Sequence, residues 1–353
     1  MIPPGSTIGI VGGGQLGRML AMASAQLGYR CHILDPHDRP CAADVAAEFT
    51  RAAYDDRSAL EAFGARVDVA TYEFENLPVG PLGVLADKLH PGVKSLAVAQ
   101  DRAEEKSFIE GTGARVAPWR SVTSLDDVAR AVAELGVPIV LKTRRYGYDG
   151  KGQAWIRSSG DAEGAWEAIR GEPAVAEAGV NFAAEFSVIV ARWADGRTTF
   201  WDSPDNVHRE GILRTSTVPA PAVIADQVEE ARAAAAGIAE ALDHVGVLTV
   251  EFFASADGPV VNEIAPRVHN SGHWTIEGAF TSQFEQHIRA ICDLPPGSTA
   301  LAASSVVMAN LIGDEIDGWQ ALLSDPRAHV HIYGKGAARP GRKMGHVTRL
   351  TLK

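Results

Sequence analysis

The sequence has little positive charge. Its 353 residues include 33 Lys and Arg against 44 Asp and Glu, which gives a net charge of −11. So acidic a chain lacks the broad basic face that wraps a nucleic acid or lies on a membrane surface. The cations that are present gather in residues 142–151, in residues 339–343 and at the isolated Arg267. This clustering predicts sites for small anionic ligands.

Cysteine is scarce, and long apolar runs are missing. Cys31, Cys41 and Cys292 are odd in number and lack the spacing of a metal site. Such usage is typical of a reducing compartment and assigns the thiols no chemistry. No apolar run approaches the ~20 residues that span a bilayer, and residues 1–5 carry no charged leader region. We therefore expect a cytoplasmic protein.

The first segment of the chain indicates a doubly wound α/β domain. A buried strand at residues 7–11 leads into a G-x-G-x-x-G turn at residues 12–17 and a helix that Gly28 ends; a second strand then reaches Asp35. This is the form of a dinucleotide-binding unit. A glycine turn that serves helix packing or binds another phosphate is the alternative, and we favour a site that does not bind nicotinamide.

A third strand is expected at residues 67–74, and it ends at Glu73 and Glu75. These carboxylates would hold a ribose or an amine at the sheet edge. The alternative is that they cap a helix or lie at a solvated edge. A last short strand is expected at residues 94–98. The helix that starts at Asp101 begins with its acid, as the helix dipole prefers, and marks the first domain boundary.

A small second domain follows, with two βαβ-like passes around a glycine loop. Ser124 is predicted to cap a helix that Gly136 ends, ahead of a strand at residues 139–143. The end of this strand and the loop after it carry Lys142, Lys151 and several glycines, a composition that suits phosphate. It is no P-loop, because Gly152 follows Lys151. A solvated basic turn is the alternative.

A β-hairpin later in the chain carries two acids among apolar residues. Folding residues 247–264 about Asp257 sets Glu251 and Glu263 opposite each other to within one residue. Two such carboxylates repel unless one is protonated or a cation lies between them, and Mg²⁺ held with nucleotide phosphates fits best. The alternative is a hairpin with both acids in water.

The loop after this hairpin combines Arg267, His269, Asn270 and His273, which suits a small oxyanion. Further on, Arg342 and Lys343 in a glycine-bearing turn suit a phosphate monoester, with a solvated basic turn as the alternative. His287 lies among helically spaced apolar residues and is expected to be structural.

Taken in this order, the motifs resemble the ATP-grasp superfamily, and within it the N5-carboxyaminoimidazole ribonucleotide synthase family. The residues that carry the resemblance are 12–18, 73–76, 100–102, 148–153, 262–273 and 339–346. The run 262–273 is the most specific. The resemblance implies α/β and α+β architecture: a Rossmann-like pre-ATP-grasp domain at 1–100, a lid at 118–178, and a larger mixed-sheet domain formed by 101–117 with 179–353.

The resemblance also implies a nucleotide site between the lid and the larger domain. Its phosphate side would include Arg102, Lys142, Gly147, Tyr148, Asp149, Gly150, Lys151, Gly152 and Gln153. The adenine-side hinge would be Glu177, Ala178, Gly179 and Val180. Glu185 would bind the ribose, His208, Asn262 and Glu263 would complete the site, and Mg²⁺ would lie on Glu251 and Glu263.

The implied reaction joins bicarbonate to 5-aminoimidazole ribonucleotide at the expense of ATP, through carboxyphosphate. Its chemistry is expected at Tyr148, Asp149, Lys151, Arg267, His269 and Asn270. Substrate contacts are expected at Gln15, Leu16, Glu73, Arg267, Asn270, Ser271, Arg342 and Lys343. The base that assists the attacking amine stays open between His269 and released phosphate. The family's habit predicts a homodimer.

Three other functions compete. A nicotinamide-dependent oxidoreductase would rest on the glycine turn and Asp35 alone. Another ATP-grasp ligase, such as formate-dependent glycinamide ribonucleotide transformylase or biotin carboxylase, would keep the nucleotide site and change the acceptor. An idle nucleotide-binding module is the third, and the intact glutamates and lysines argue against it.

Overall fold

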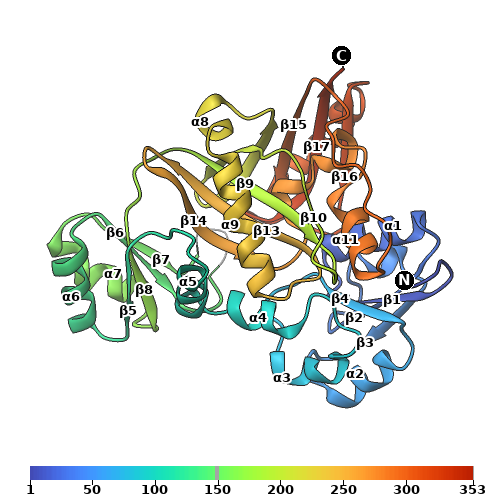
Figure 1. Ribbon diagram of the computed structural model, residues 1–353, viewed down its shortest axis with the longest axis horizontal. Coiled ribbons are helices and arrows are strands. Elements are labelled where there is room, and N and C mark those ends of the chain that lie inside the picture. Colours follow the sequence, from blue (N-terminus) through green and yellow to red (C-terminus); the bar gives the residue numbers. More distant parts are fainter. Residues whose placement is uncertain (148–150, 353) are drawn as a thin grey trace.

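Three β-sheets divide the chain between them, and Figure 1 shows them side by side. The structure is a computed structural model that describes residues 1–147 and 151–352. Tyr148, Asp149 and Gly150 therefore lie outside the described residues. Within the described part, no helix has the length and apolar character needed to cross a membrane.

The N-terminal sheet is parallel, with the strand order β3 (Glu48–Arg51), β2 (Arg30–Asp35), β1 (Thr7–Val11) and β4 (Val69–Tyr72). Helix α1 (Gln15–Gln26) follows the glycine turn, and α2 (Arg57–Gly64) precedes β4. The strand expected at 67–74 is thus the fourth one. Strand β3 escaped prediction because its four residues are only partly buried and mostly polar.

The strand expected at residues 94–98 is wrong, because this segment is helix α4 (Val93–Ala99), which packs against α5 (Arg102–Gly111). The position beside β4 is taken instead by Leu89, which forms an isolated parallel bridge with Ala70. Short apolar runs fit a strand or a helix equally well, so packing decides. The start of α5 is confirmed, since Asp101 caps it by accepting from the Ala103 N–H at 3.0 Å.

The lid sheet is antiparallel rather than built of βαβ passes, with the order β5 (Trp119–Val122), β8 (Ala174–Ala178), β6 (Ile139–Thr143) and β7 (Gln153–Ile156). Helices α6 (Leu125–Leu135) and α7 (Ala162–Ala168) pack on it. The predicted caps of α6 are confirmed: Ser124 accepts from the Asp127 N–H, and Gly136 ends the helix at φ 76°.

The largest sheet has nine strands, and all their pairings are antiparallel. The sheet expected to be mixed is therefore almost wholly antiparallel, and its parallel contact is the isolated bridge between Val116 and Val261. The strands in spatial order are β14 (Gly258–Ala265), β13 (Gly246–Ser255), β9 (Phe182–Arg192), β11 (Asp205–Arg209), β12 (Ile212–Val218), β15 (Ser305–Ile312), β17 (Lys343–Thr351) and β16 (Ala328–Ile332), with β10 (Thr198–Phe200) on β9.

Helix α9 (Val228–Ala241) packs on β9 and β13, and α11 (Gln283–Ile291) also contacts these two strands. Side chains of α9 and α11 belong to two different buried apolar clusters. The remaining helices are short: α3 (Val79–Leu82), α8 (Ala222–Ala225), α10 (Thr275–Gly278) and α12 (Trp319–Leu323).

The N-terminal and nine-stranded sheets share a buried core in which α1 packs on α11. His287 accepts from the Val247 N–H through Nδ1 and donates from Nε2 to Thr71 Oγ1, 2.8 Å away. His244 donates from Nε2 to the Val247 carbonyl and accepts from Ser95 Oγ. His287 is thus structural, as predicted. The two histidines fix the N-terminal domain against the larger one.

Candidate active site

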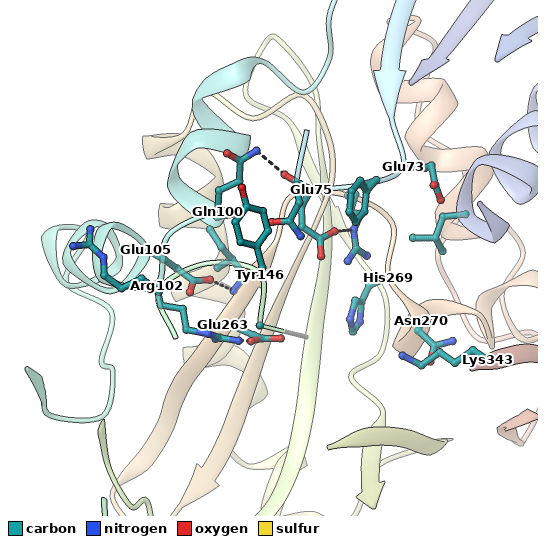
Figure 2. A pocket seen from close by; sticks show the side chains of 18 of the residues that line it. Glu73, Glu75, Gln100, Arg102, Glu105, Tyr146, Glu263, His269, Asn270 and Lys343 are labelled. Atoms are coloured by element: carbon teal, nitrogen blue, oxygen red, sulfur yellow. Dashed lines mark hydrogen bonds and ion pairs between the residues drawn. The ribbon is translucent and has the colours of Figure 1, made fainter. Parts of the chain in front are cut away.

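Two cavities meet at one ion pair. The lid cavity, about 340 Å³, lies between the lid sheet and the nine-stranded sheet. The N-terminal cavity, about 580 Å³, lies beside Glu73 at the end of β4. Arg102 and Glu263 line both cavities, and Arg102 Nη1 donates to Glu263 Oε2 at 2.9 Å (Figure 2). A group held at this ion pair is accessible from both sides.

The glutamate pair of the hairpin is confirmed, because Glu251 and Glu263 are direct cross-strand partners in β13 and β14. Burial, and then the charge of Glu263, raises the pKa of Glu251 to about 7. Burial acts to raise the pKa of Glu263 too, but Arg102 and Lys142 outweigh it and hold that pKa below its usual value. Glu263 is therefore ionised, whereas a bound cation would stabilise the ionised form of Glu251.

The residues fit a hard divalent cation. Carboxylate oxygens of Glu251 and Glu263 line the lid cavity with the Asn262 side chain, and Mg²⁺ prefers such oxygen ligands. No group of three or more His, Cys, Asp and Glu among residues 1–147 and 151–352 forms a complete metal cage. That donor set matches the usual Mg²⁺ arrangement, in which substrate phosphates and water supply the other ligands.

Lys142 lies between the two sides of the lid cavity. Its Nζ donates to Glu177 Oε2 at 3.1 Å and to Asn262 Oδ1 at 3.2 Å. Burial, more than the attraction of Glu177, decides the pKa of Lys142 and lowers it. The lysine thus reaches from the lid strand β6 to the hairpin strand β14, which places its charge at the inner end of the cavity.

The predicted hinge and ribose residues all line the lid cavity: Glu177, Ala178, Gly179, Val180, Glu185 and His208. His208 Nδ1 lies 3.0 Å from Glu185 Oε2. Burial acts to lower the pKa of His208, but the contact with Glu185, together with the negative charges of Glu251, Glu185 and Glu263, outweighs it and raises that pKa. A carboxylate and a histidine so paired offer two anchors for hydroxyl groups.

Sequence reasoning missed the apolar walls of this cavity, which are Val140, Trp155, Phe182 and Phe253. Phe182 and Phe253 stack with ring centroids 4.5 Å apart. Such walls are typical of the part of a ligand site that covers a flat apolar ring. The available signal was the alternation of β13, in which Phe253 lies on the same face of its strand as Glu251.

The glycine loop contributes to both cavities. Lys151 and Gln153 line the lid cavity, and Gly147 lines the N-terminal cavity. Gly152 lines neither, but its φ is +70° and a Cβ there would come within 2.5 Å of Thr143 Oγ1. This position therefore requires glycine.

Glu73 is the anion at the glycine turn. The Gly14 and Gly17 N–H groups donate to its two carboxylate oxygens at 2.9 and 3.3 Å. Burial raises the pKa of Glu73 despite these bonds. Asp35 is engaged in the same way, since it accepts from the Gly13 N–H and from Tyr54. These carboxylates fill the place that a dinucleotide pyrophosphate and ribose would need, which argues against a nicotinamide site.

The opposite wall of the N-terminal cavity is the loop after β14. Arg267 is ion-paired with Glu75 and lines the cavity. His269 and Asn270 line the same cavity (Figure 2). Burial, and then the charge of Arg267, puts the pKa of His269 well below its usual value, so the ring is neutral. His269 Nε2 lies 3.3 Å from Glu251 Oε1. A neutral histidine thus lies between the glutamate pair and the N-terminal cavity.

Buried amides hold this loop. Asn270 and Asn310 exchange two side-chain hydrogen bonds of 2.9 and 2.6 Å. The side chain of Gln283 binds both the N–H and the carbonyl of His269. Since each amide satisfies a buried polar group, the loop is fixed before any ligand binds.

The structure does not bring every predicted residue to the cavities. Gln15, Leu16 and Lys343 line the N-terminal cavity, but Ser271 and Arg342 do not. Ser271 is buried behind His269 and binds its Nδ1 at 2.9 Å. Arg342 lies one residue before β17 and donates to the Ala337 carbonyl. Cavity-lining residues that the predicted site omits are Phe74, Asn76, Ala99, Gln100, Glu105, Tyr146 and Ile264.

Three known domain families match the chain. Residues 5–100 match the ribonucleotide synthetase preATP-grasp domain, residues 107–284 the ATP-grasp domain, and residues 306–352 the phosphoribosylaminoimidazole carboxylase C-terminal domain. The ATP-grasp match alone covers half of the chain.

Full-length relatives carry one common name. N5-carboxyaminoimidazole ribonucleotide synthase of Brucella melitensis is 50% identical over 99% of this chain and 97% of its own length. The Bacillus subtilis enzyme of the same name is 42% identical over 99% and 92%.

Solved structures agree with these relatives. An N5-carboxyaminoimidazole ribonucleotide synthetase in complex with ADP has a TM-score of 0.95 at 43% identity and covers 100% of this chain and 94% of its own. The Aspergillus clavatus enzyme in complex with ADP and 5-aminoimidazole ribonucleotide has a TM-score of 0.92 at 32% identity, over 98% and 94%.

Proposed function

Because this chain belongs to the N5-carboxyaminoimidazole ribonucleotide synthase family of ATP-grasp ligases, we propose that its two cavities divide the two halves of one reaction. The chain is an ATP-dependent carbon–nitrogen ligase of purine biosynthesis that carboxylates 5-aminoimidazole ribonucleotide. The lid cavity binds ATP, and the N-terminal cavity binds bicarbonate and the ribonucleotide. The observation that carries this division is the Arg102–Glu263 pair, which lines both cavities.

In the lid cavity, the adenine lies between the apolar walls and the hinge from Glu177 to Val180, and the ribose hydroxyls bind Glu185 and His208. The phosphates point toward Lys142, Lys151 and Arg102, which supply positive charge at the inner end. Predicted contacts at Tyr148, Asp149 and Gly150 lie outside the described residues. This orientation is supported by the apolar and charged ends of the cavity.

Glu251 and Glu263, with Asn262, would hold Mg²⁺ beside the phosphates. When bound, Mg²⁺ neutralises charge on the transferring phosphoryl group. The chain's own share of that task falls to Arg102 and Lys142, whose guanidinium and ammonium groups face the same space. Phosphoryl transfer depends mainly on such positioning and charge neutralisation.

Bicarbonate binds beside Arg267, His269 and Asn270, where the fixed loop presents a cation and two hydrogen-bonding side chains. Its oxygen takes the γ-phosphoryl group of ATP, and carboxyphosphate and ADP result. Carboxyphosphate is labile in water, so its site must exclude water until the amine attacks. The amine of the ribonucleotide then attacks the carboxyl carbon and phosphate leaves.

The ribonucleotide occupies the rest of the N-terminal cavity. Gln15, Leu16 and Glu73 face its imidazole and ribose, and Lys343 binds its phosphate. Arg342 adds positive charge to this end without lining the cavity. Ser271 acts behind His269. The support for this orientation is that the cation Lys343 and the carboxylate Glu73 both line the cavity.

We further propose the domain division 1–100, 118–178, and 101–117 with 179–353, since each part contains one sheet. A homodimer in the cytoplasm follows from the family's habit and the reduced cysteines. Light scattering of the purified protein tests the dimer, and a mass near 37.4 kDa would contradict it.

The function is tested by ADP release from Mg·ATP, measured with and without the ribonucleotide and with bicarbonate present or stripped. Release that needs both establishes the ligase. Release without the ribonucleotide would keep the nucleotide site and reject the acceptor. Formate in place of bicarbonate, if it supported turnover, would favour a formate-dependent ligase instead.

A further inference from the structure

Lys106 is a buried lysine that lies outside both cavities. It lies on α5, its side chain is 1% exposed, and it lines neither the lid cavity nor the N-terminal cavity. Its Nζ lies 3.1 Å from Glu177 Oε2, on the hinge strand β8. Buried ammonium groups are costly unless they are paired, so its position needs a reason.

Two lysines share this one carboxylate. Lys142 Nζ lies 3.1 Å from the same Glu177 Oε2, and the Glu177 side chain is only 4% exposed. The other oxygen, Glu177 Oε1, is buried and has no hydrogen-bond partner; Lys106 Nζ faces Oε2 as an ion pair without hydrogen-bond geometry, whereas Lys142 Nζ donates to Oε2. The cluster Lys106–Glu177–Lys142 thus carries a net positive charge, with Lys142 facing the lid cavity and Lys106 behind it.

The contribution of Lys106 is clear when Lys142 is considered as the only partner of Glu177. With Lys142 alone, the pair would be neutral, and drawing the ammonium toward phosphates would leave Glu177 buried and uncompensated. Breaking a buried pair in this way is strongly unfavourable. With Lys106 in place, Glu177 keeps a counter-ion when Lys142 turns to a ligand. Burial acts to raise the pKa of Glu177, but Lys142 and Lys106 outweigh it and lower that pKa.

We propose that Lys106 is a positioning residue that neutralises Glu177 and so frees the Lys142 ammonium to bind the ATP phosphates. This inference rests on the proposed nucleotide site and adds to it a residue that does not touch the ligand. Lys106 also ties α5 to the lid strand that carries the hinge, so the same ion pair fixes the lid strand to the larger domain.

Four variants of the full-length protein test this proposal: Lys106→Met, Lys106→Arg, Glu177→Gln and the double variant Lys106→Met/Glu177→Gln. Affinity for Mg·ADP is measured by calorimetry, and KM is measured separately for ATP and for the ribonucleotide. Lys106→Met should weaken ADP binding and raise the KM for ATP by roughly 30-fold, because Lys142 then pairs with Glu177 alone. The KM for the ribonucleotide should not change.

The double variant is the decisive arm. Glu177 also belongs to the nucleotide hinge, so the double variant is compared with Glu177→Gln alone. Without the carboxylate, Lys142 is free whether or not Lys106 is present, so these two variants should bind ADP with affinities within about 3-fold of each other. Lys106→Arg, which keeps the charge, should lie between wild type and Lys106→Met. If Lys106 only filled the core, Lys106→Met would cost as much affinity in the Glu177→Gln background as it does alone.

Lys88→Met is the matched control. Lys88 lies in the N-terminal domain and donates to the carbonyls of Gly64 and Val67, so its loss should leave nucleotide affinity and both KM values unchanged. Unaltered ADP affinity in Lys106→Met, or a loss on Lys106→Met that is equally large in the Glu177→Gln background, would overturn the proposal. Should Lys106→Met fail to fold, Lys106→Gln takes its place as the single variant.

Binding of ADP does not require the acceptor, so this test is separate from the test of function. A wild-type protein that ignores the ribonucleotide would reject the proposed acceptor and leave the Lys106 result standing. A wild-type protein that fails to bind ADP would reject the nucleotide site itself.

Discussion

The lid cavity takes most of its polar residues from strands of two sheets, whereas the N-terminal cavity joins Gln15, at one end of the chain, to Lys343 near the other. The first cavity is rich in ion pairs that exist before any ligand arrives, such as Lys142 with Glu177. The second contains the ion pair Arg267–Glu75, but its carboxylate Glu73 is held by the glycine-turn amides. We therefore expect ATP binding to exchange charge partners, and acceptor binding to depend more on the shape that backbone groups fix.

This difference predicts that most substitutions affect one substrate only, and that the shared ion pair is the exception. Glu263→Gln should lower kcat for ADP formation by about 1000-fold or more, because it removes a metal-binding carboxylate and the partner of Arg102. Steady-state ADP release measures this. The exposed Glu240→Gln, on α9, is the control and should behave as wild type. Normal turnover of Glu263→Gln would reject the proposed metal site.

On the acceptor side, Lys343→Ala should raise the KM for the ribonucleotide by about 100-fold and leave the KM for ATP unchanged, since a charge-assisted phosphate contact is lost. Arg342→Ala should show the same selectivity with a smaller effect, because Arg342 does not line the cavity. Initial rates at varied ribonucleotide measure both. An equal rise in the two KM values would mean that the phosphate lies elsewhere.

On the nucleotide side, Phe253→Ala should raise the KM for ATP by about 10-fold, because the adenine loses an apolar wall and Phe182 loses its stacking partner. The KM for the ribonucleotide is the internal control. If Phe253→Ala raised the KM for the ribonucleotide instead, the lid cavity would be the acceptor site and the N-terminal cavity the ATP site.

The contact between the N-terminal and the larger domain, which His244 and His287 form, should lose stability in acid. Neither KM at neutral pH should depend on it. Burial lowers the pKa of His244 to about 4 and that of His287 to about 3. In the unfolded chain the pKa of each histidine is near 6.5. Between that pH and the folded pKa, the unfolded chain therefore binds more protons than the folded one, and stability is lost as pH falls below about 6.5.

Each of these histidines should cost about 1.6 kcal/mol of unfolding free energy between pH 6.5 and pH 5, because the slope reaches ~1.36 kcal/mol per pH unit only below the unfolded pKa. Urea unfolding at the two pH values measures the loss. His244→Gln, which does not titrate, should remove its own share of about 1.6 kcal/mol from the acid dependence. An unchanged pH slope in that variant would show that this contact does not control it.

Local signals in the sequence predicted much of this structure. A turn at Asp257 sets the register of Glu251 and Glu263, and Ser124, Asp101 and Gly136 mark helix ends through their own backbone bonds. The hinge and the ribose pair follow from a specific family resemblance.

Tertiary packing determined the rest. Residues 94–98 form a helix because α5 packs against them, and the bridge at Leu89 takes the place of the expected strand. The pairs Arg267–Glu75, Asn270–Asn310 and Lys106–Glu177 join distant segments. Nothing in one partner's local sequence specifies the other partner.

The central claim is that bicarbonate receives the phosphoryl group where the two cavities meet. The most direct measurement uses bicarbonate labelled with ¹⁸O, together with ATP and the ribonucleotide, and follows the label by mass spectrometry. Attack by bicarbonate oxygen predicts one ¹⁸O in each phosphate released, with the remaining label in the carboxylated product. Phosphate without label would contradict the account.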